Sequence, residues 1–433
     1  MGIKLAVIGA ASSYTPELFY TLAEDRNRLG VEQVSLVDLN AEKLSLIASV
    51  CERLVQDNQL DLNLASATNV EEGVSGADFI LVQIRVGGLE ARVRDETLPM
   101  ELGMVGNETT GAGGFVCALR TVPIMLEIAR VVERVAPEAW ILNLSNPAGI
   151  VTEAILKHTK LRALGFCNIP INTTYALAHL LEVDPATVQL DSFGLNHLSW
   201  TRRVLVNGED RLGSLLDEAH DRNSALYQHG LVEYHLPPDM LQRIRMIPSW
   251  YVRYFYYPEI ILEEDRQDQQ TKGMHDMQAE EELHTIYQTY GYTRRAQEIL
   301  SGKGGSQYYL PVLQAIDSIV NDRGDVIIVD TENQGALPDL PANVCIEVPA
   351  RIFRAGAKPL QADTMPLAVR GLVQTVKAYE EMTIEAALTG NHQTAIAALM
   401  ANPLVGTYPK ARAYLDRVLE NEHGYLQQFF PRD

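Results

Sequence analysis

The chain has 433 residues, of which 46% are apolar and 21% are charged, and its formal net charge is −20. This length exceeds one ordinary core, so we expect two domains. The negative charge argues against binding to nucleic acid or to an anionic membrane surface. Four cysteines do not make a disulfide scaffold in so long a chain, and no stretch approaches the ~20 apolar residues of a membrane span. We therefore expect a cytoplasmic protein that contacts neither nucleic acid nor membrane.

The first half of the chain alternates short apolar runs with helix-periodic segments. Strands are predicted at 3–8, 34–38, 79–83, 140–143 and 163–166. Helices are predicted from residue 15 onwards and at 41–57, 116–135 and 149–158. This alternation predicts an α/β fold with a Rossmann-like, doubly wound parallel sheet, which we assign to a domain spanning residues 1–168.

The second half mixes strands with longer helices. Strands are predicted at 200–206, 326–329 and 344–348, and helices at 279–288 and 369–388. We expect residues 169–433 to form an α+β domain that carries catalytic and substrate-binding groups and supports oligomerisation.

A nucleotide-binding turn is predicted directly after the first strand, at Gly9, Ala10, Ala11, Ser12 and Ser13. Backbone N–H groups of such a turn can approach a pyrophosphate at a helix N-terminus. Asp38, at the end of the second strand, can bind both ribose hydroxyls and would repel a 2′-phosphate, which favours NAD over NADP. Because two expected glycines are alanines, a sheet of this type that binds another ligand, or none, stays an alternative.

Two residues of metal-ligand type follow apolar runs. Cys167 and His197 both lie at predicted strand ends, where ligands collect in open α/β folds. Taken singly, the cysteine could be a small buried apolar residue and the histidine a satisfied polar residue beside the core. Together they suit a transition ion with open positions, which substrate oxygens would complete.

Six motifs, in this order, resemble glycoside hydrolase family 4, the NAD- and Mn²⁺-dependent glycosidases. They are 9–18, 84–88, 106–114, 143–147, 167–170 and 194–197. Similarity continues beyond residue 400 through the segments 331–336 and 367–373. The resemblance implies that the second domain is like the C-terminal domain of lactate and malate dehydrogenases. It also implies a homodimer or homotetramer.

The resemblance also implies a role for particular residues. Cys167 and His197 would bind Mn²⁺ or another divalent metal, and Tyr251 would be the catalytic base. Arg92 and Asn146 would contact the sugar or its phosphate, and Arg85 would belong to the cofactor site.

Asn168 stands where relatives that act on α-linked 6-phosphoglucosides have Asp and relatives that act on α-galactosides have His. Asn followed by Ile-Pro resembles the 6-phospho-β-glucosidase branch, so we expect Asn168 at both the catalytic and the substrate site. The expected substrate is a phosphorylated disaccharide or an aryl glucoside.

The expected mechanism is a redox-neutral hydrolysis. NAD⁺ takes hydride from C3, the metal polarises the ketone, Tyr251 removes the C2 proton, and the leaving group at C1 departs. Water then adds and the hydride returns. Tyrosine has an ordinary pKa of ~10, so the pKa of Tyr251 must fall for this role, and a nearby cation is the usual cause.

The sequence departs from the family where the 6-phosphate is expected to bind. His275 is the closest match to a phosphate-binding arginine, Lys272 offers only a point charge, and Glu332 replaces another arginine. A family 4 glycosidase acting on a non-phosphorylated or differently acidic glycoside is therefore an alternative. An NAD-dependent hydroxy-acid dehydrogenase and a catalytically silent NAD-binding relative are two more.

Overall fold

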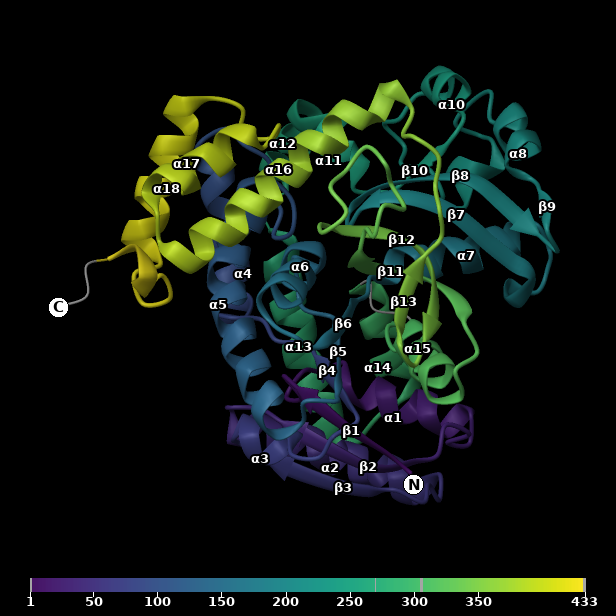
Figure 1. The fold of residues 1–433 in the computed structure, drawn as a ribbon, viewed down its shortest axis with the longest axis vertical. Coiled ribbons are helices and arrows are strands. Elements are labelled where there is room, and N and C mark those ends of the chain that lie inside the picture. Colours follow the sequence, from purple (N-terminus) through teal and green to yellow (C-terminus); the bar gives the residue numbers. More distant parts are fainter. Residues whose placement is uncertain (1, 269, 304–306, 431–433) are drawn as a thin grey trace.

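The computed structural model describes residues 2–268, 270–303 and 307–430. Within them, one sheet of nine strands runs through the molecule in the order β13-β12-β11-β6-β5-β4-β1-β2-β3 (Figure 1). The strands are β1 (Ile3–Ile8), β2 (Val31–Val37), β3 (Asn63–Ala67), β4 (Phe79–Val82), β5 (Trp140–Asn143), β6 (Arg162–Gly165), β11 (Asp325–Glu332), β12 (Cys345–Phe353) and β13 (Gly356–Pro359). Strands β1 to β6 pair in parallel, and β11 to β13 add to β6 in antiparallel pairing.

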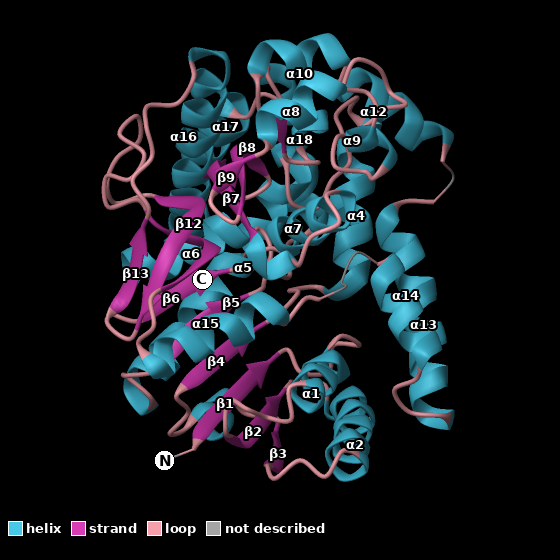
Figure 2. Ribbon diagram, turned by 90° about the vertical axis from the view of Figure 1, so that its right-hand side faces the viewer, coloured by secondary structure: helices cyan, strands magenta, loops and turns pink. Residues whose placement is uncertain are grey.

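Alternating side chains of the sheet enter two separate cores. Ala6 and Ile8 of β1 belong to one hydrophobic cluster, and Leu5 and Val7 belong to the other. Because successive residues of a strand point to opposite faces, a continuous apolar run such as 3–8 requires helices on both sides. Figure 2 shows α1 and α2 beside strands β1 to β3. This is the doubly wound sheet that the sequence predicts.

The helices divide between these two cores. One face of the sheet packs against α1 (Thr15–Glu24), α2 (Ala41–Asp57), α13 (Lys272–Thr289), α14 (Arg294–Gly302) and α15 (Leu310–Asn321). The core on the other face contains side chains of α3 (Val70–Val74), α4 (Gly88–Glu101), α5 (Gly111–Val135), α6 (Ala148–His158), α16 (Leu367–Thr389), α17 (His392–Ala401) and α18 (Tyr408–Asn421).

A smaller antiparallel sheet lies above the large one, in teal in Figure 1. It contains β7 (Val188–Leu195), β8 (Leu198–Val206), β9 (Glu209–Asp210) and β10 (Ile247–Pro248). Around it lie α7 (Asn168–Leu180), α8 (Leu212–Glu218), α9 (Ala225–Gln228), α10 (Pro238–Ile244), α11 (Val252–Tyr256) and α12 (Pro258–Gln267), and the 3₁₀ turns are Pro185–Thr187 and Gln427–Phe429. Phe193 and Trp200 point to the large core, whereas Leu190 and Val204 enter a third cluster.

The large sheet contains strands from both sides of residue 168, where we expect the first domain to end. Strand β11 joins β6 through the pair Asp330 and Gly165, so strands from the second half of the chain complete the sheet begun by the first. The division into 1–168 and 169–433 stays a prediction. No helix among residues 2–268, 270–303 and 307–430 is both long and apolar enough to cross a membrane.

Helix α5 begins five residues before the predicted start at 116. Its first turn is Gly-Ala-Gly-Gly, and glycine is a poor helix former. Here the glycines are required by close packing: a Cβ on Gly113 would lie 2.2 Å from the carbonyl oxygen of Asn107. Tertiary contact therefore overrides the local preference.

Candidate active site

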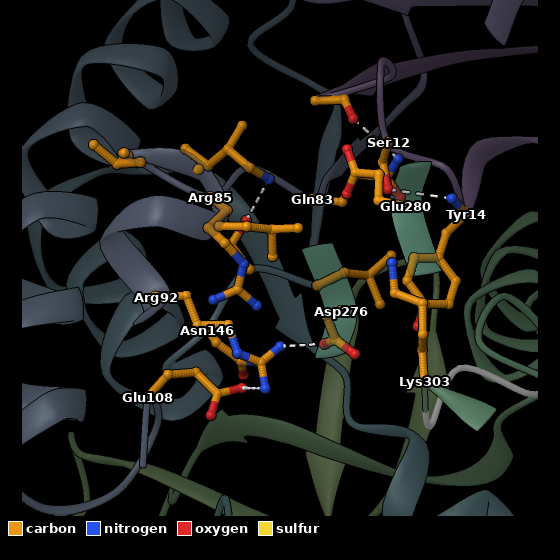
Figure 3. A pocket seen from close by; sticks show the side chains of 18 of the residues that line it. Ser12, Tyr14, Gln83, Arg85, Arg92, Glu108, Asn146, Asp276, Glu280 and Lys303 are labelled. Atoms are coloured by element: carbon orange, nitrogen blue, oxygen red, sulfur yellow. Dashed lines mark hydrogen bonds and ion pairs between the residues drawn. The ribbon is translucent and has the colours of Figure 1, made fainter. Parts of the chain in front are cut away.

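One cavity of about 1390 Å³ opens at the carboxyl ends of the parallel strands. It is lined by the loops after β1, β2, β4, β5 and β6 together with α13 and the segment around Tyr251. Figure 3 shows part of this lining, including Ser12, Arg85 and Asn146. The predicted site residues that line it are Gly9, Ala11, Ser12, Ser13, Asp38, Arg85, Arg92, Asn146, Cys167, Asn168, His197, Tyr251 and His275. The fold thus brings residues more than 260 positions apart to one place.

The turn after β1 has the tight geometry expected of a nucleotide loop. Gly9 has φ +85°, and a Cβ there would lie 2.8 Å from the carbonyl oxygen of Gln83, so only glycine fits. Asp38 accepts backbone hydrogen bonds from Ala11 at 3.0 Å and from Asn40 at 2.9 Å. Ala10 is fully buried in the core and is absent from the described lining, so its methyl group does not enter the cavity.

The predicted metal ligands meet. Cys167 caps the N-terminus of α7, directly after β6, and His197 sits in the turn between β7 and β8 with φ +63°. The Sγ of Cys167 lies 3.5 Å from Nε2 of His197. Across the described ranges, no group of three or more His, Cys, Asp or Glu side chains is arranged to hold a metal. Two side chains leave positions for other ligands around an ion, and the metal-binding role of the pair stays a prediction.

The two proposed ligands differ in their readiness to bind a metal. His197 is neutral and can bind directly, whereas the Cys167 thiol must first lose its proton. Burial lowers the pKa of His197 to about 4, which keeps the imidazole neutral and able to bind a metal. Burial, assisted by the charge of Glu347, raises the pKa of the Cys167 thiol well above its usual range. The donor set fits a divalent transition ion, provided that binding displaces the thiol proton.

Tyr251 lies directly against this pair. It caps the N-terminus of α11, and its ring stacks on that of His197 with centroids 4.0 Å apart and planes 6° from parallel. Burial raises the pKa of Tyr251 well above its usual value, Glu108 raises it further, and Arg92 opposes the shift. The expected lowering of the Tyr251 pKa is not found for the chain alone, because the effect of burial outweighs that of Arg92.

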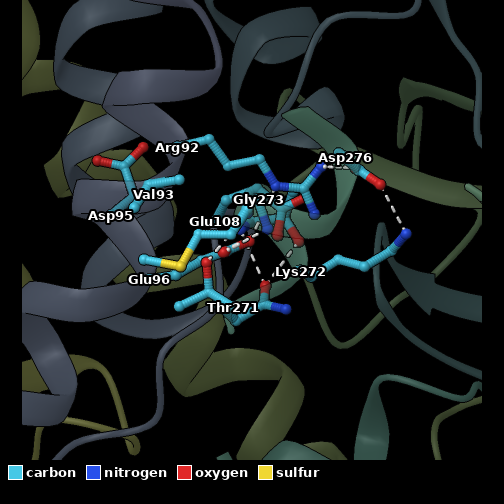
Figure 4. Close-up of polar contacts among 12 residues, drawn as sticks. Arg92, Val93, Asp95, Glu96, Glu108, Thr271, Lys272, Gly273 and Asp276 are labelled. Carbon is cyan, nitrogen blue, oxygen red and sulfur yellow. Dashed lines mark hydrogen bonds and ion pairs between the residues drawn. The ribbon is translucent and has the colours of Figure 1, made fainter. Parts of the chain in front are cut away.

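The guanidinium group of Arg92 forms ion pairs with three carboxylates (Figure 4). Its guanidinium lies 2.8 Å from Glu96, 2.9 Å from Glu108 and 2.6 Å from Asp276. Glu96 also accepts the backbone N–H of Gly273 at 2.7 Å. The arginine predicted to contact sugar or phosphate thus also ties α4 to α13 and to the loop before α5.

The other predicted substrate residues lie around the same cavity. Asn146 precedes a cis proline, and its carbonyl oxygen accepts a contact from Cys117 Sγ at 3.5 Å. Asn168 is the first residue of α7. His275 on α13 is half exposed, with Nε2 3.9 Å from Asp268. Lys272, one turn earlier, binds Asp276 at 2.7 Å.

The structure adds groups that sequence reasoning missed. Glu108, Lys303 and Tyr308 also line the cavity, and Glu347 lies buried behind the metal pair. Glu347 accepts hydrogen bonds from Asn196 at 2.9 Å and from Ser199 at 3.0 Å, the residues flanking His197 and Leu198. Glu108 lies within the family motif at 106–114, which is the sequence signal that could have identified it. Lys303 and Glu347 carry no local signal.

Comparison with known proteins gives a family. The family model described as family 4 glycosyl hydrolase matches residues 4–183, and that of the family 4 glycosyl hydrolase C-terminal domain matches residues 192–405. A probable 6-phospho-beta-glucosidase of Bacillus subtilis (strain 168) is 35% identical, over 99% of this chain and 98% of the relative. The chain belongs to glycosyl hydrolase family 4, so it is a glycosidase, and the resemblance seen in the sequence is confirmed.

Solved structures agree on the fold. The 6-phospho-beta glucosidase from Thermotoga maritima, solved with manganese, NAD⁺ and glucose-6-phosphate, superposes with a TM-score of 0.88 at 29% identity. That match covers 98% of this chain and 99% of the other. Malate dehydrogenase from Plasmodium falciparum, solved with NADH, reaches a TM-score of 0.50 at 15% identity, over 89% and 98% of the two chains. The predicted α/β fold, with its likeness to the malate dehydrogenase fold, is confirmed.

Proposed function

We propose that this protein hydrolyses 6-phospho-β-glucosides by a redox-neutral reaction that uses NAD and a divalent metal, Mn²⁺ in the first instance. The observation that carries the proposal is the convergence of Cys167, His197 and Tyr251 in a cavity that the glycine turn after β1 also lines. The names of the relatives support the substrate class, and the Thermotoga maritima structure was solved with NAD⁺, manganese and glucose-6-phosphate.

The proposed chemistry divides between bound groups and the chain. When bound, NAD⁺ and the divalent ion supply hydride acceptance at the sugar and Lewis-acid polarisation of the carbonyl so formed. Cys167 and His197 are the proposed metal ligands. Tyr251 is the proposed base, and its Oη takes the proton from C2 of the sugar once positive charge next to its ring offsets burial and Glu108.

The proposed β preference rests on Asn168. This residue begins α7 and lines the cavity beside Cys167. An amide does not donate a proton at neutral pH as a carboxylic acid does, so the leaving group must depart with help from water or through its own low basicity. Arg92, Asn146 and His275 are the proposed sugar and phosphate contacts, and Gly9 to Ser13, Asp38 and Arg85 form the proposed NAD site.

The testing experiment compares paired substrates. Purified protein, supplied with NAD⁺, Mn²⁺ and a reductant, is given p-nitrophenyl α- and β-glucosides and galactosides, each with and without a 6-phosphate. We expect the 6-phospho-β-glucoside to have the highest kcat/KM. A higher kcat/KM for an unphosphorylated glycoside would overturn the substrate assignment.

A second measurement separates the proposal from a dehydrogenase with the same fold. The proposed reaction returns its hydride, so glycoside cleavage should produce no net NADH, measured by its near-ultraviolet absorbance. Stoichiometric NADH formation with a hydroxy acid would favour the dehydrogenase. No cleavage of any of these glycosides would favour a silent relative.

We further propose that the substrate is a phosphorylated disaccharide or aryl glucoside, that the protein acts in the cytoplasm, and that it forms a homodimer or homotetramer. The four cysteines are free thiols, as is usual for proteins of a reducing compartment. A metal ligand at Cys167 also requires a free thiol. Exposed Leu367 at the start of α16 and Tyr408 at the start of α18 are apolar groups suited to an interface. Light scattering after gel filtration measures the assembly directly, and a monomer at all concentrations would refute it.

A further inference from the structure

The charged side chains of the cavity differ in whether they have a partner. Six lysines and arginines line it: Lys43, Arg85, Arg92, Arg253, Lys272 and Lys303. Four of them are ion-paired, since Lys43 lies 3.4 Å from Glu280, Arg253 lies 3.5 Å from Glu233, Lys272 binds Asp276 and Arg92 binds three carboxylates. In the part of the chain that the structure describes, Arg85 and Lys303 have no carboxylate within ion-pairing distance.

Lys303 is a partly buried cation without a counter-ion. It follows the last turn of α14, and its Nζ lies 5.3 Å from the centroid of the Tyr14 ring. Burial lowers the pKa of Lys303; Glu280 and Asp276 oppose this shift, and Lys272 and Arg92 add to it. A partly desolvated ammonium group of this kind gains most from an anion that enters the cavity.

The surroundings of Lys303 point to the sugar side of the cavity. The charged groups that act on it most are Glu280, Asp276, Lys272 and Arg92, which belong to α13 and α4. In Figure 3, Asp276 is drawn between Arg92 and Lys303. Asp276 binds both Arg92 and Lys272, so these two cations already have a carboxylate partner when an anion enters, whereas Lys303 has none within ion-pairing distance in the described residues.

We propose that Lys303 binds the phosphate group of the substrate, and that it supplies the charge that His275 and Lys272 do not. The inference rests on the proposed function, because it requires a 6-phosphorylated sugar. Lysine acts here as a point charge on a flexible stem, a mode of phosphate binding that does not need bidentate geometry. The Tyr14 ring, below the ammonium group, helps to hold the stem in the cavity.

A second source of phosphate is the pyrophosphate of NAD, because Tyr14 directly follows the nucleotide loop. The experiment therefore measures both ligands by calorimetry on the NAD-free and NAD-loaded protein. We compare wild type with K303M, which keeps the length of the side chain but removes its charge, and with K303R, which restores the charge. Glucose 6-phosphate is titrated in the presence of NAD⁺ and Mn²⁺, and NAD⁺ is titrated without sugar.

The expected result is specific to the sugar phosphate. K303M should weaken glucose 6-phosphate binding by about 10- to 100-fold, the loss expected for one charge-assisted hydrogen bond. K303R should recover most of the affinity, and NAD⁺ binding should be unchanged in both variants. Near-UV circular dichroism checks that each variant keeps its fold.

Three results would overturn the inference. Weaker NAD⁺ binding by K303M, with glucose 6-phosphate unaffected, would assign Lys303 to the cofactor. Unchanged binding of both ligands would remove it as a phosphate contact and leave the proposed function standing. If the wild type itself binds no glucose 6-phosphate and prefers unphosphorylated glycosides, the proposed function and this inference fail together.

Discussion

The imidazole of His197 lies flat against the phenol ring of Tyr251, with the ring centroids 4.0 Å apart. The Nε2 atom of the same imidazole lies 3.5 Å from the Sγ atom of Cys167. A metal bound by Cys167 and His197 would therefore place positive charge next to the proposed base. This is the charge that Tyr251 needs, since burial and Glu108 raise its pKa in the chain alone.

Replacing the phenol should stop the reaction without removing the metal. We expect Y251F to lower kcat by about 10²- to 10⁴-fold, the usual contribution of a positioned base, because phenylalanine cannot take a proton. Mn²⁺ affinity, measured by calorimetry, should be nearly unchanged. Y254F is the matched control, since Tyr254 lines the same cavity with its ring 5.7 Å from that of Tyr251. A fully active Y251F enzyme would exclude Tyr251 as the base.

Metal binding should release a proton. The pKa of the Cys167 thiol is raised by burial, so at neutral pH the free protein carries S–H, whereas a metal ligand must be thiolate. Mn²⁺ affinity should therefore increase as pH rises, by about tenfold per pH unit for one proton. Titrations in buffers with different ionisation enthalpies count the protons, and C167S should abolish the release. Binding without any proton release in wild type would contradict this assignment.

Arg92 should prove important for stability as well as for binding. Removing its charge leaves Glu96, Glu108 and Asp276 buried without their shared partner. We expect R92M to lower the free energy of unfolding by about 3–5 kcal/mol in urea titrations, the range for breaking a buried ion pair. R412M, which breaks an exposed pair with Asp416, should leave the free energy of unfolding nearly unchanged, because water screens an exposed ion pair. Equal effects of the two substitutions would argue that the three contacts contribute little.

Glu347 should position His197 for the metal. It accepts hydrogen bonds from Asn196 and Ser199, and so fixes the turn in which His197 has φ +63°. Such supporting residues usually change metal affinity by about 10- to 100-fold. We expect that loss for E347A and a smaller one for E347Q, which keeps one acceptor oxygen. The electron paramagnetic resonance signal of free Mn²⁺ measures the affinity, and near-UV circular dichroism checks that each variant keeps its fold. Unchanged Mn²⁺ affinity in E347A would contradict this role.

The proposed reactive residues of the site could be predicted from the sequence, but the residues that position them could not. Gly9, Asp38 and Cys167 could be predicted because each follows a strand, and parallel strands deliver their carboxyl ends to one edge. His197 was also predicted from the end of a strand, although that strand belongs to the smaller antiparallel sheet. Tyr251 required the family resemblance. Their roles stay predictions, whereas their meeting in one cavity is an observation.

The supporting groups depend on contacts between distant segments. Glu347 reaches Asn196 across 151 positions, and Arg92 reaches Asp276 across 184. Lys303 stands out because no carboxylate among the described residues lies within ion-pairing distance of it. No local sequence pattern predicts such a feature. The early start of α5 was missed for a similar reason, because Gly113 packs against the backbone of Asn107 and Asp95.

The most direct test of the account follows the hydrogen at C2 of the sugar. A two-carboxylate glycosidase leaves that hydrogen in place, whereas the reaction proposed here removes it and restores it from solvent. Cleavage of a 6-phospho-β-glucoside in D₂O, followed by NMR of the product at once, should show deuterium at C2 of glucose 6-phosphate. Product that retains hydrogen at C2 throughout would contradict the proposed mechanism.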